Sequence, residues 1–151
     1  MKTGEACIRT VVCIEPHAGI HEAARLMRQH HVGDLVIVDS GEDGKARPIG
    51  IVTDRDLVIE VLAMDLDLDR VNVVDLFCSP RLITVSVNEE LETTLDIMWQ
   101  HGIRRIPVLE SDGSLAGILT VDDMVELLSE QLGLVTRLIT RQLDIETRRR
   151  E

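Results

Sequence analysis

The apolar positions of this chain form short runs and helical stripes that recur in the same order in both halves. Runs rich in β-branched residues at 11–14 and 82–85 are bounded by polar residues, which predicts a strand at each place. Apolar residues then recur at helical spacing over 20–27 and 91–98, so a helix that buries one stripe should follow each run. Asn88 is a suitable cap for the second of these helices.

Each half continues with two buried strands joined by a polar turn. We expect these strands at 35–38 and 49–52 in the first half, and at 106–109 and 115–119 in the second. The turns between them are rich in Gly, Asp and Ser, residues that commonly end strands. Each half therefore contributes a strand, a helix and a hairpin to the predicted fold.

A second helix should close each half, at about 54–64 and about 121–132. It begins in nearly the same sequence in both, Gly-Ile-Val-Thr-Asp-Arg-Asp-Leu at 50–57 and Gly-Ile-Leu-Thr-Val-Asp-Asp-Met at 117–124. Apolar positions map onto apolar positions almost throughout, with an offset of 71 upstream of the turn and 67 downstream of it. The chain is therefore a tandem duplication of one β-α-β-β-α unit, in the α/β (α+β) class.

We place the first repeat at 1–66, the second repeat at 67–133 and a C-terminal tail at 134–151. The tail departs from the repeat, and its apolar residues form one stripe of an amphipathic helix, made by Leu134, Val135, Leu138, Ile139 and Leu143. Such a face needs a partner, so we expect the tail to pack on its own module or to contribute to a dimer. A membrane surface or another protein is the alternative partner.

In each copy a Thr-x-x-Asp motif lies between the last strand and the closing helix, as Thr53 with Asp56 and as Thr120 with Asp123. An ionised aspartate can accept hydrogen bonds from both hydroxyls of a ribose, threonine can donate to a phosphate, and amides at a helix start add N–H donors. The same pattern is also close to a capping box, in which both side chains only cap the helix. The residues of the motif alone leave both interpretations open.

Four segments together resemble the cystathionine β-synthase (CBS) domain. They are Pro16-x3-Ile20-x2-Ala23-x3-Met27, Val32-x5-Val38-Asp39, the Gly-Ile-Val-Thr-x2-Asp-Leu motif, and Ile103-Arg104-Arg105-Ile106-Pro107-Val108. The resemblance covers about residues 3–132 and implies two units packed through their sheets into one module. It also implies clefts that bind adenosyl ligands such as AMP, ADP, ATP or S-adenosylmethionine, and a role in regulation rather than catalysis.

Basic residues distinguish the two copies. The resemblance places Arg104 and Arg105 where family members often carry basic residues facing ligand phosphates, and arginine can bind phosphate through two donors. The first copy has Gly33 and Asp34 there, whereas Arg55 lies inside the first Thr-x-x-Asp motif. We therefore expect two unequal clefts, with a solvated surface charge as the alternative for each arginine. The resemblance assigns the base to aliphatic residues that are otherwise typical of a core, Ile14, Val85, Ile106 and Pro107.

Composition excludes several classes of protein. The formal net charge is −11, and residues 134–151 hold five arginines against three acids, so the remainder carries −11 − 2 = −13, which disfavours nucleic-acid binding. No apolar run approaches the ~20 residues needed to cross a bilayer and no signal-peptide pattern is present, so we expect a cytoplasmic protein without membrane insertion. Cys7, Cys13 and Cys78 are expected to be reduced thiols, and neither they nor the histidines predict a metal site.

The sequence favours a non-catalytic regulatory module that binds an adenosyl ligand between its repeats. It should form a homodimer and signal to a separate, unidentified partner protein. The alternative is a ligand-independent dimeric scaffold or regulatory subunit, in which both Thr-x-x-Asp motifs are only caps. An enzyme is disfavoured, because no persuasive nucleophile-base pair or metal constellation is present. No obligatory cofactor is expected; an adenine nucleotide or S-adenosylmethionine would act as a regulatory ligand.

Overall fold

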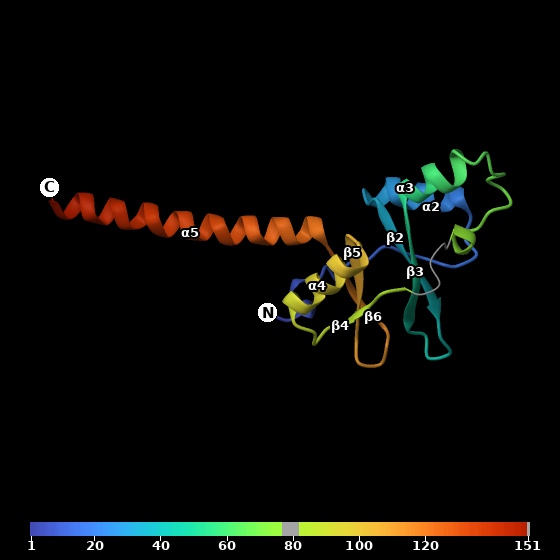
Figure 1. Cartoon of the computed structure of the whole chain (residues 1–151), viewed down its shortest axis with the longest axis horizontal. Helices are drawn as coiled ribbons and strands as arrows, with labels where there is room; N and C mark the ends of the chain where they lie inside the picture. Colours follow the sequence, from blue (N-terminus) through green and yellow to red (C-terminus); the bar gives the residue numbers. More distant parts are fainter. Residues whose placement is uncertain (77–81, 151) are drawn as a thin grey trace.

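Two three-stranded sheets with the same strand order form the centre of the protein. The computed structural model describes residues 1–76 and 82–150. In the first sheet, β1 (Cys13–Ile14) pairs in parallel with β2 (Asp34–Ser40), which pairs antiparallel with β3 (Ala46–Thr53). The second sheet repeats this topology with β4 (Val85–Ser86), β5 (Arg105–Leu109) and β6 (Leu115–Thr120). The predicted duplication and the mixed α+β class are confirmed (Figure 1).

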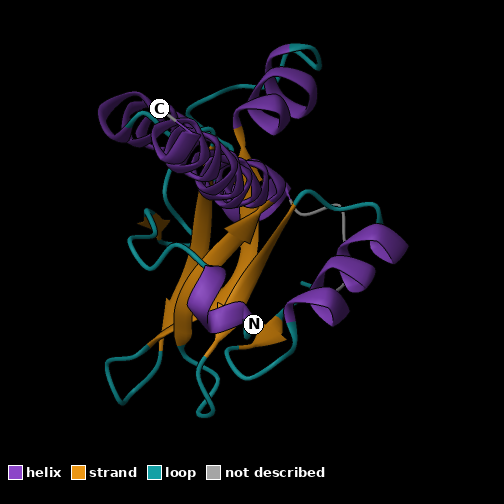
Figure 2. Ribbon diagram, turned by 90° about the vertical axis from the view of Figure 1, so that its left-hand side faces the viewer, coloured by secondary structure: helices purple, strands orange, loops and turns teal. Residues whose placement is uncertain are grey.

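The helices lie outside the sheets. In the first repeat they are α2 (Ile20–His30), then α3 (Asp54–Asp56), which continues as the π-helix η1 (Leu57–Leu62). In the second repeat they are α4 (Leu91–His101) and α5 (Val121–Arg150). Figure 2 shows the strands together at the centre, with helices around them and the hairpin loops gathered at one end. An ion pair between the turn residues Lys45 and Asp112 joins the two hairpins at that end.

The start of α4 differs from the prediction. Glu90, not Asn88, is the residue that precedes the helix, and it makes no side-chain cap hydrogen bond. The first helical amide, that of Leu91, instead donates to the backbone carbonyl of Met1 at 3.0 Å. The N-terminus of the chain therefore takes over part of the capping that the sequence assigned to a side chain.

Each repeat has its own core, and a third apolar cluster joins the two sheets. The first core includes Leu35 and Ile37 from β2, and the second includes Ile106 and Val108 from β5. The connecting cluster is built from the opposite faces of the sheets, with Val36, Val38 and Ile118 buried at its centre. Because side chains alternate along a strand, β2 serves both its own core and the joint between repeats. The repeats are thus held together through their sheets.

The segment that leads each repeat packs on the other repeat. Thr3, in α1 (Thr3–Ala6), is fully buried, and its Oγ1 lies 2.6 Å from Oγ1 of Thr94 in α4. Ile8 exchanges two backbone hydrogen bonds with Ile118 of β6, at 2.8 and 2.9 Å. In the same way η2 (Val73–Leu76) joins the first repeat, where the Val73 amide donates to the carbonyl of Ala18 at 2.9 Å. Packing therefore crosses the division that the sequence places at residue 66.

The helix α5 is one continuous helix of 30 residues, longer than the predicted 121–132, and Gly133 does not interrupt it. Its second half projects away from the two sheets (Figure 1). The apolar stripe of this half is exposed, with 71% of Leu138 and 57% of Ile139 accessible. The tail thus does not pack on its own module, and its contribution to a dimer stays a prediction.

Candidate functional site

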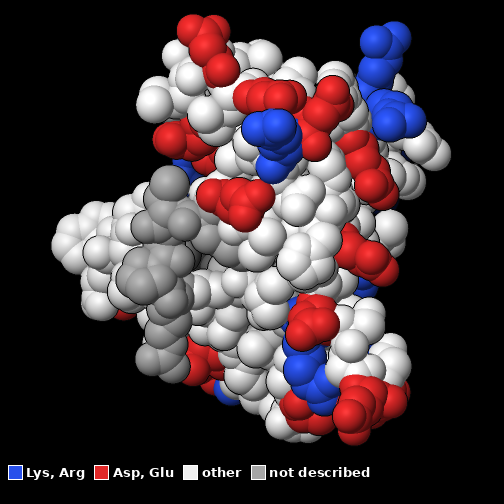
Figure 3. Space-filling model, turned by 90° about the vertical axis from the view of Figure 1, so that its right-hand side faces the viewer, with Lys and Arg blue, Asp and Glu red and all other residues white. Residues whose placement is uncertain are grey.

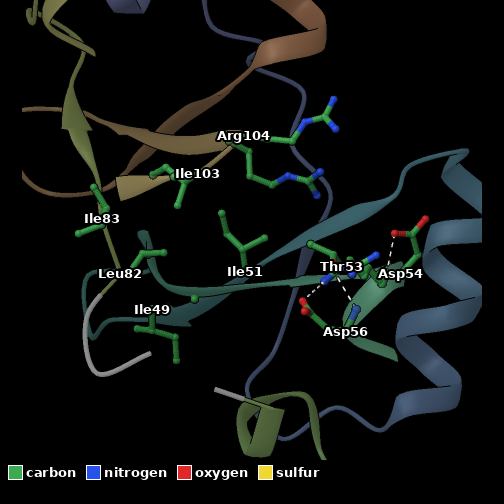
Figure 4. Close-up of a pocket in the computed structure, with 13 residues that line it drawn as sticks. Ile49, Ile51, Thr53, Asp54, Asp56, Leu82, Ile83, Ile103 and Arg104 are labelled. Atoms are coloured by element: carbon green, nitrogen blue, oxygen red, sulfur yellow. Dashed lines mark hydrogen bonds between the residues drawn. The ribbon is translucent and has the colours of Figure 1, made fainter. Parts of the chain in front are cut away.

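A cavity of about 620 Å³ lies between the two repeats. Its walls come from β3 and the start of α3 in the first repeat, and from the segments before β4 and β5 in the second. One end is apolar, and the other carries threonine, aspartates and arginines (Figure 4). The apolar end is lined by Ile49, Ile51, Leu82, Ile83 and Ile103, and the polar end by Thr53, Asp54, Arg55, Asp56, Arg104 and Arg105.

Alternate side chains of β3 form one wall of this cavity. Ile49, Ile51 and Thr53 occupy every second position and line the cavity, whereas Val52 lies between them on the other face and is buried in the core. Sequence reasoning singled out Thr53 and missed the two isoleucines. Strand alternation could have indicated both isoleucines, because residues two and four positions before Thr53 on a strand lie on the same face as Thr53.

The first Thr-x-x-Asp motif forms a capping box in the structure. The Thr53 amide donates to Oδ2 of Asp56 at 2.8 Å, and the Asp56 amide donates to Oγ1 of Thr53 at 3.1 Å. These bonds occupy one carboxylate oxygen of Asp56 and an acceptor position of Thr53. Within the described part of the chain, Oδ1 of Asp56 and the hydroxyl hydrogen of Thr53 have no partner. The cap is therefore compatible with a second role toward a bound hydroxyl or phosphate.

The second motif uses its groups differently. The Thr120 hydroxyl donates to Oδ2 of Asp123 at 2.6 Å, in addition to the two backbone bonds of the box at 3.2 and 3.1 Å. The hydroxyl hydrogen is thereby consumed inside the cap. Thr53 offers a donor to the cavity, whereas its equivalent Thr120 does not.

Arginines from both copies meet at the polar end of the cavity. Arg55 belongs to the first copy, and Arg104 and Arg105 belong to the second. Figure 4 shows the Arg104 side chain extending toward the end of the cavity where Thr53 lies. The face in Figure 3 shows acidic groups scattered over it and basic groups in a few places. Three arginines around one cavity are thus a local exception in a chain of net charge −11.

Arg105 is the arginine most closely held by the protein. Its Nη1 lies 2.8 Å from Oδ2 of Asp34, which is the equivalent residue of the first repeat. This nitrogen is buried, and the contact is not aligned as a hydrogen bond. Burial raises the pKa of the Asp34 carboxyl, an effect that Arg105 opposes and the nearby Asp123 and Asp54 reinforce. The Arg105 guanidinium therefore has donor capacity left for an anion.

Arg104 is the more exposed of the pair, and its Nη2 lies 3.2 Å from Oδ1 of Asp122. Asp122 occupies the position in the second copy that Arg55 occupies in the first. The positions equivalent to the three arginines are thus Gly33, Asp34 and Asp122, which carry no positive charge. The sequence predicted a charge difference between the copies. In the structure all three arginines lie around the cavity between the repeats.

The other predicted site residues do not line this cavity. Thr120 and Asp123 belong to the second capping box. Ile14, Val85 and Ile106 are buried in the two repeat cores, and Pro107 is fully buried in β5. Ile14, Val85 and Ile106 occupy strand positions that face the cores, whereas the wall at the apolar end comes from Leu82 and Ile83 just before β4. Their proposed contact with a base stays untested.

The histidines and cysteines lie apart from the cavity. His30 and His101 are the last residues of α2 and α4, where a basic side chain complements the helix dipole. Burial raises the pKa of the Cys7 and Cys13 thiols, which favours their protonated form at neutral pH; Cys78 lies outside the described residues. Within 1–76 and 82–150, no three His, Cys, Asp or Glu side chains group as metal ligands. No helix in these ranges is both long and apolar enough to span a membrane.

Comparison with solved structures shows the same architecture in other proteins. The crystal structure of Hypoxic Response Protein I with two coordinated zinc ions matches with a TM-score of 0.69 and 31% identity, over 83% of this chain and 98% of that one. A CBS domain protein from Pyrobaculum aerophilum complexed with AMP matches with a TM-score of 0.70 and 28% identity, over 85% of this chain and 99% of that one.

Sequence comparisons agree. Hypoxic response protein 1 of Mycobacterium tuberculosis is 35% identical over 120 residues, which are 80% of each protein. An uncharacterized protein of Methanopyrus kandleri is 36% identical over 126 residues, 83% of this chain and 62% of that relative's length. The family model of the CBS domain matches twice, over residues 4–63 and 73–130. With two matched copies and the corresponding fold, the chain belongs to the CBS domain family.

Proposed function

We propose that the chain is a non-catalytic sensor that binds an adenine nucleotide in the cavity between its repeats and signals its occupancy to a partner protein. The observation that carries the proposal is the division of one cavity into an apolar end and an arginine-rich end. A nucleotide has the same division, with a flat base at one end and a charged phosphate at the other. Support also comes from the Pyrobaculum relative, whose solved structure is complexed with AMP.

The residues define one orientation of the ligand. The base would lie among Ile49, Ile51 and Ile83, where backbone groups would read its polar edge, because none of the described residues that line the cavity is aromatic. The ribose hydroxyls would donate to the free oxygen of Asp56, and the phosphate would accept from Thr53 and the arginines. S-adenosylmethionine fits less well, because its sulfonium cation would face the three guanidinium groups.

Thermal denaturation with candidate ligands tests the function. AMP or ATP at about 100 times its Kd should stabilise the fold by about 2.7 kcal/mol, which corresponds to a rise in Tm of roughly 5–10 °C. Calorimetric titration should give one nucleotide per chain, because Arg55, Arg104 and Arg105 all line the same cavity. NADH and S-adenosylmethionine serve as comparison ligands. If no adenosyl ligand raises Tm, the ligand-independent scaffold becomes the better description.

Asp34 should limit the affinity, because a phosphate must compete with it for Arg105. The Asp34→Asn variant is expected to bind AMP roughly fivefold more tightly, the effect of removing one partly exposed ion pair. Folding raises the pKa of Asp34, so the folded state is less stable when this carboxyl is ionised. The stability that the protonated carboxyl contributes is lost as pH rises through the raised pKa. Asparagine carries no charge, so Asp34→Asn should preserve the stability at neutral pH. Asp39→Asn, on the same strand but exposed, is the matched control for charge. Unchanged or weaker binding by Asp34→Asn would contradict this role.

A further inference from the structure

An ion pair crosses from one repeat to the other at the polar end of the cavity. Asp34 and Arg105 are equivalent residues, each the first of its strand, and Nη1 of Arg105 lies 2.8 Å from Oδ2 of Asp34. Both are largely shielded from water, with 21% of the Asp34 side chain and 26% of the Arg105 side chain exposed. Asp34 pairs across the sheet with Thr53, and both Thr53 and Arg105 line the cavity. A bound nucleotide would therefore place its phosphate beside this pair.

The other charged groups that face Asp34 are acidic. Among the described residues, Arg105 of β5 favours the ionised form of Asp34, whereas Asp54 in the first turn of α3 and Asp123 in the first turn of α5 oppose it. Asp54 is held nearby, because its amide donates to the carbonyl of Gly33, the neighbour of Asp34, at 3.0 Å. Burial is the largest influence, and it raises the pKa of the Asp34 carboxyl. Within the described chain, the charge of Asp34 thus depends on one cation.

A phosphate in the cavity competes for that cation. Nη1 of Arg105 is buried and makes no aligned hydrogen bond, so Asp34 holds the guanidinium by charge at short range. A phosphate can instead accept two parallel N–H bonds from a planar guanidinium, which makes it the better aligned partner. It also brings negative charge next to Asp34, and a like charge nearby favours the protonated form of a carboxyl. Binding of the nucleotide therefore weakens the interaction that keeps Asp34 ionised.

We propose that the cavity takes up a proton on Asp34 as it binds a nucleotide, so that the protein senses the nucleotide and acidity together. Proton uptake depends on the proposed function, because the same cavity must bind the nucleotide. The proton comes from solvent and adds to a carboxylate oxygen of Asp34, which becomes a neutral acid. The Arg105 guanidinium then serves the phosphate, and Asp34 is no longer repelled by Asp54, Asp123 and the phosphate.

Nucleotide affinity should therefore rise as pH falls. The pKa of Asp34 should be higher in the complex than in the free protein, because the phosphate adds negative charge and takes up the guanidinium. The proton strengthens binding fully below the pKa of the free protein, and this gain is lost as pH rises through the higher pKa of the complex. Between the two values, each fall of one pH unit should strengthen binding by up to about tenfold.

Calorimetric titration of the full-length chain with AMP counts the protons. At each pH from about 5 to about 8 the titration is repeated in buffers of different ionisation enthalpy, because the observed heat then changes in proportion to the protons exchanged. The phosphate of AMP also titrates in this range, near about pH 6, and it contributes equally to the original chain and to Asp34→Asn. The original chain should take up more protons than Asp34→Asn, by a difference that approaches one per bound AMP between the two pKa values of Asp34.

A carbon-13 NMR titration of the side-chain carboxyls gives a second measurement on the unaltered chain. The Asp34 signal should titrate at a higher pH with saturating AMP than without it. An Asp34 pKa that AMP leaves unchanged would overturn the proposal, whether or not the Asp34→Asn variant folds.

Asp39→Asn, an exposed change on the same strand, is the matched control and should take up protons like the original chain. Circular dichroism checks that each variant is folded. Equal proton counts for the original chain and Asp34→Asn, with AMP bound by both, would overturn proton uptake at Asp34 and leave the proposed function standing. A deficit in Asp39→Asn as large as that in Asp34→Asn would overturn it as well. Failure of the original chain to bind AMP at any pH would overturn the proposed function and the proton uptake together.

Discussion

Replacing Arg104 and Arg105 together by alanine is expected to weaken AMP binding by on the order of 100-fold or more. Hydrogen bonds between a charged donor and a charged acceptor contribute about 1.5–3 kcal/mol each. Losing two of them costs at least about 3 kcal/mol, which corresponds to a rise in Kd of roughly 100-fold or more. Among the described residues that line the cavity, the phosphate would retain Arg55 and Thr53 as side-chain donors. Isothermal titration with AMP measures the loss, with adenosine as a ligand that lacks the phosphate and should be nearly insensitive to the change.

The matched control is Arg137→Ala/Arg141→Ala in the projecting half of α5. It lowers the formal net charge by the same two units, from −11 to −13, but lies outside the cavity, so AMP affinity should change little. A second variant, Arg104→Lys/Arg105→Lys, keeps the charge and the partner of Asp34 while removing the planar fork; it should bind with intermediate affinity. Undiminished binding by the folded alanine variant would remove both arginines from the site.

Local sequence patterns predicted most of the fold, because they depend on contacts within a few residues. The run 35–38 is the buried part of β2, and 49–52 lies inside β3. Helical spacing likewise gave α2 and α4 within three residues at either end. These elements agree with their prediction because one face of each is buried in the core of its own repeat. Periodicity records that kind of burial directly.

Contacts between distant segments could not be predicted in the same way. Nothing in the sequence near Asn88 indicates that Met1 will cap α4, since that depends on the N-terminal segment packing on the second repeat. The length of α5 was not predicted for another reason. Gly133 interrupts the helical pattern of the sequence, but a glycine inside a helix costs only about 1 kcal/mol. Capping and helix length are decided by small free energies that the surroundings can outweigh.

The sequence named most of the residues that line the polar end of the cavity, but it did not name those that line the apolar end. Thr53, Asp56 and the three arginines were named because charged and hydroxyl groups suit a nucleotide. Which cleft each arginine serves depends on how the sheets pack, and the sequence left this open. For the base, the resemblance indicated Ile106, which faces the core, whereas Ile103 lines the cavity. Which residue near the start of β5 lines the cavity depends on how this strand is oriented relative to the other repeat. That orientation is known only from the packed structure.

The exchange of leading segments should make Gly117→Ala strongly destabilising. A Cβ atom at Gly117 would lie 2.6 Å from the backbone oxygen of Ile8 and 2.8 Å from Sγ of Cys7, too close for either to remain in place. The obstacle is backbone, so it cannot rotate away as a flexible side chain would. Relief requires moving the segment whose Ile8 forms two backbone bonds with Ile118. We expect a loss of about 2–3 kcal/mol in the free energy of unfolding, at the upper end of the range for overpacking.

Urea denaturation followed by circular dichroism measures this loss, and Gly133→Ala is the opposite control. No heavy atom lies within 4 Å of a Cβ atom built at Gly133, in the interior of α5, so alanine there should increase helix content and stabilise the helix by up to about 1 kcal/mol. The same chemical change should therefore have opposite signs at the two positions. If Gly117→Ala were as stable as the original chain, residues 1–8 would not be docked on β6, and the exchanged packing of the repeats would have to be abandoned.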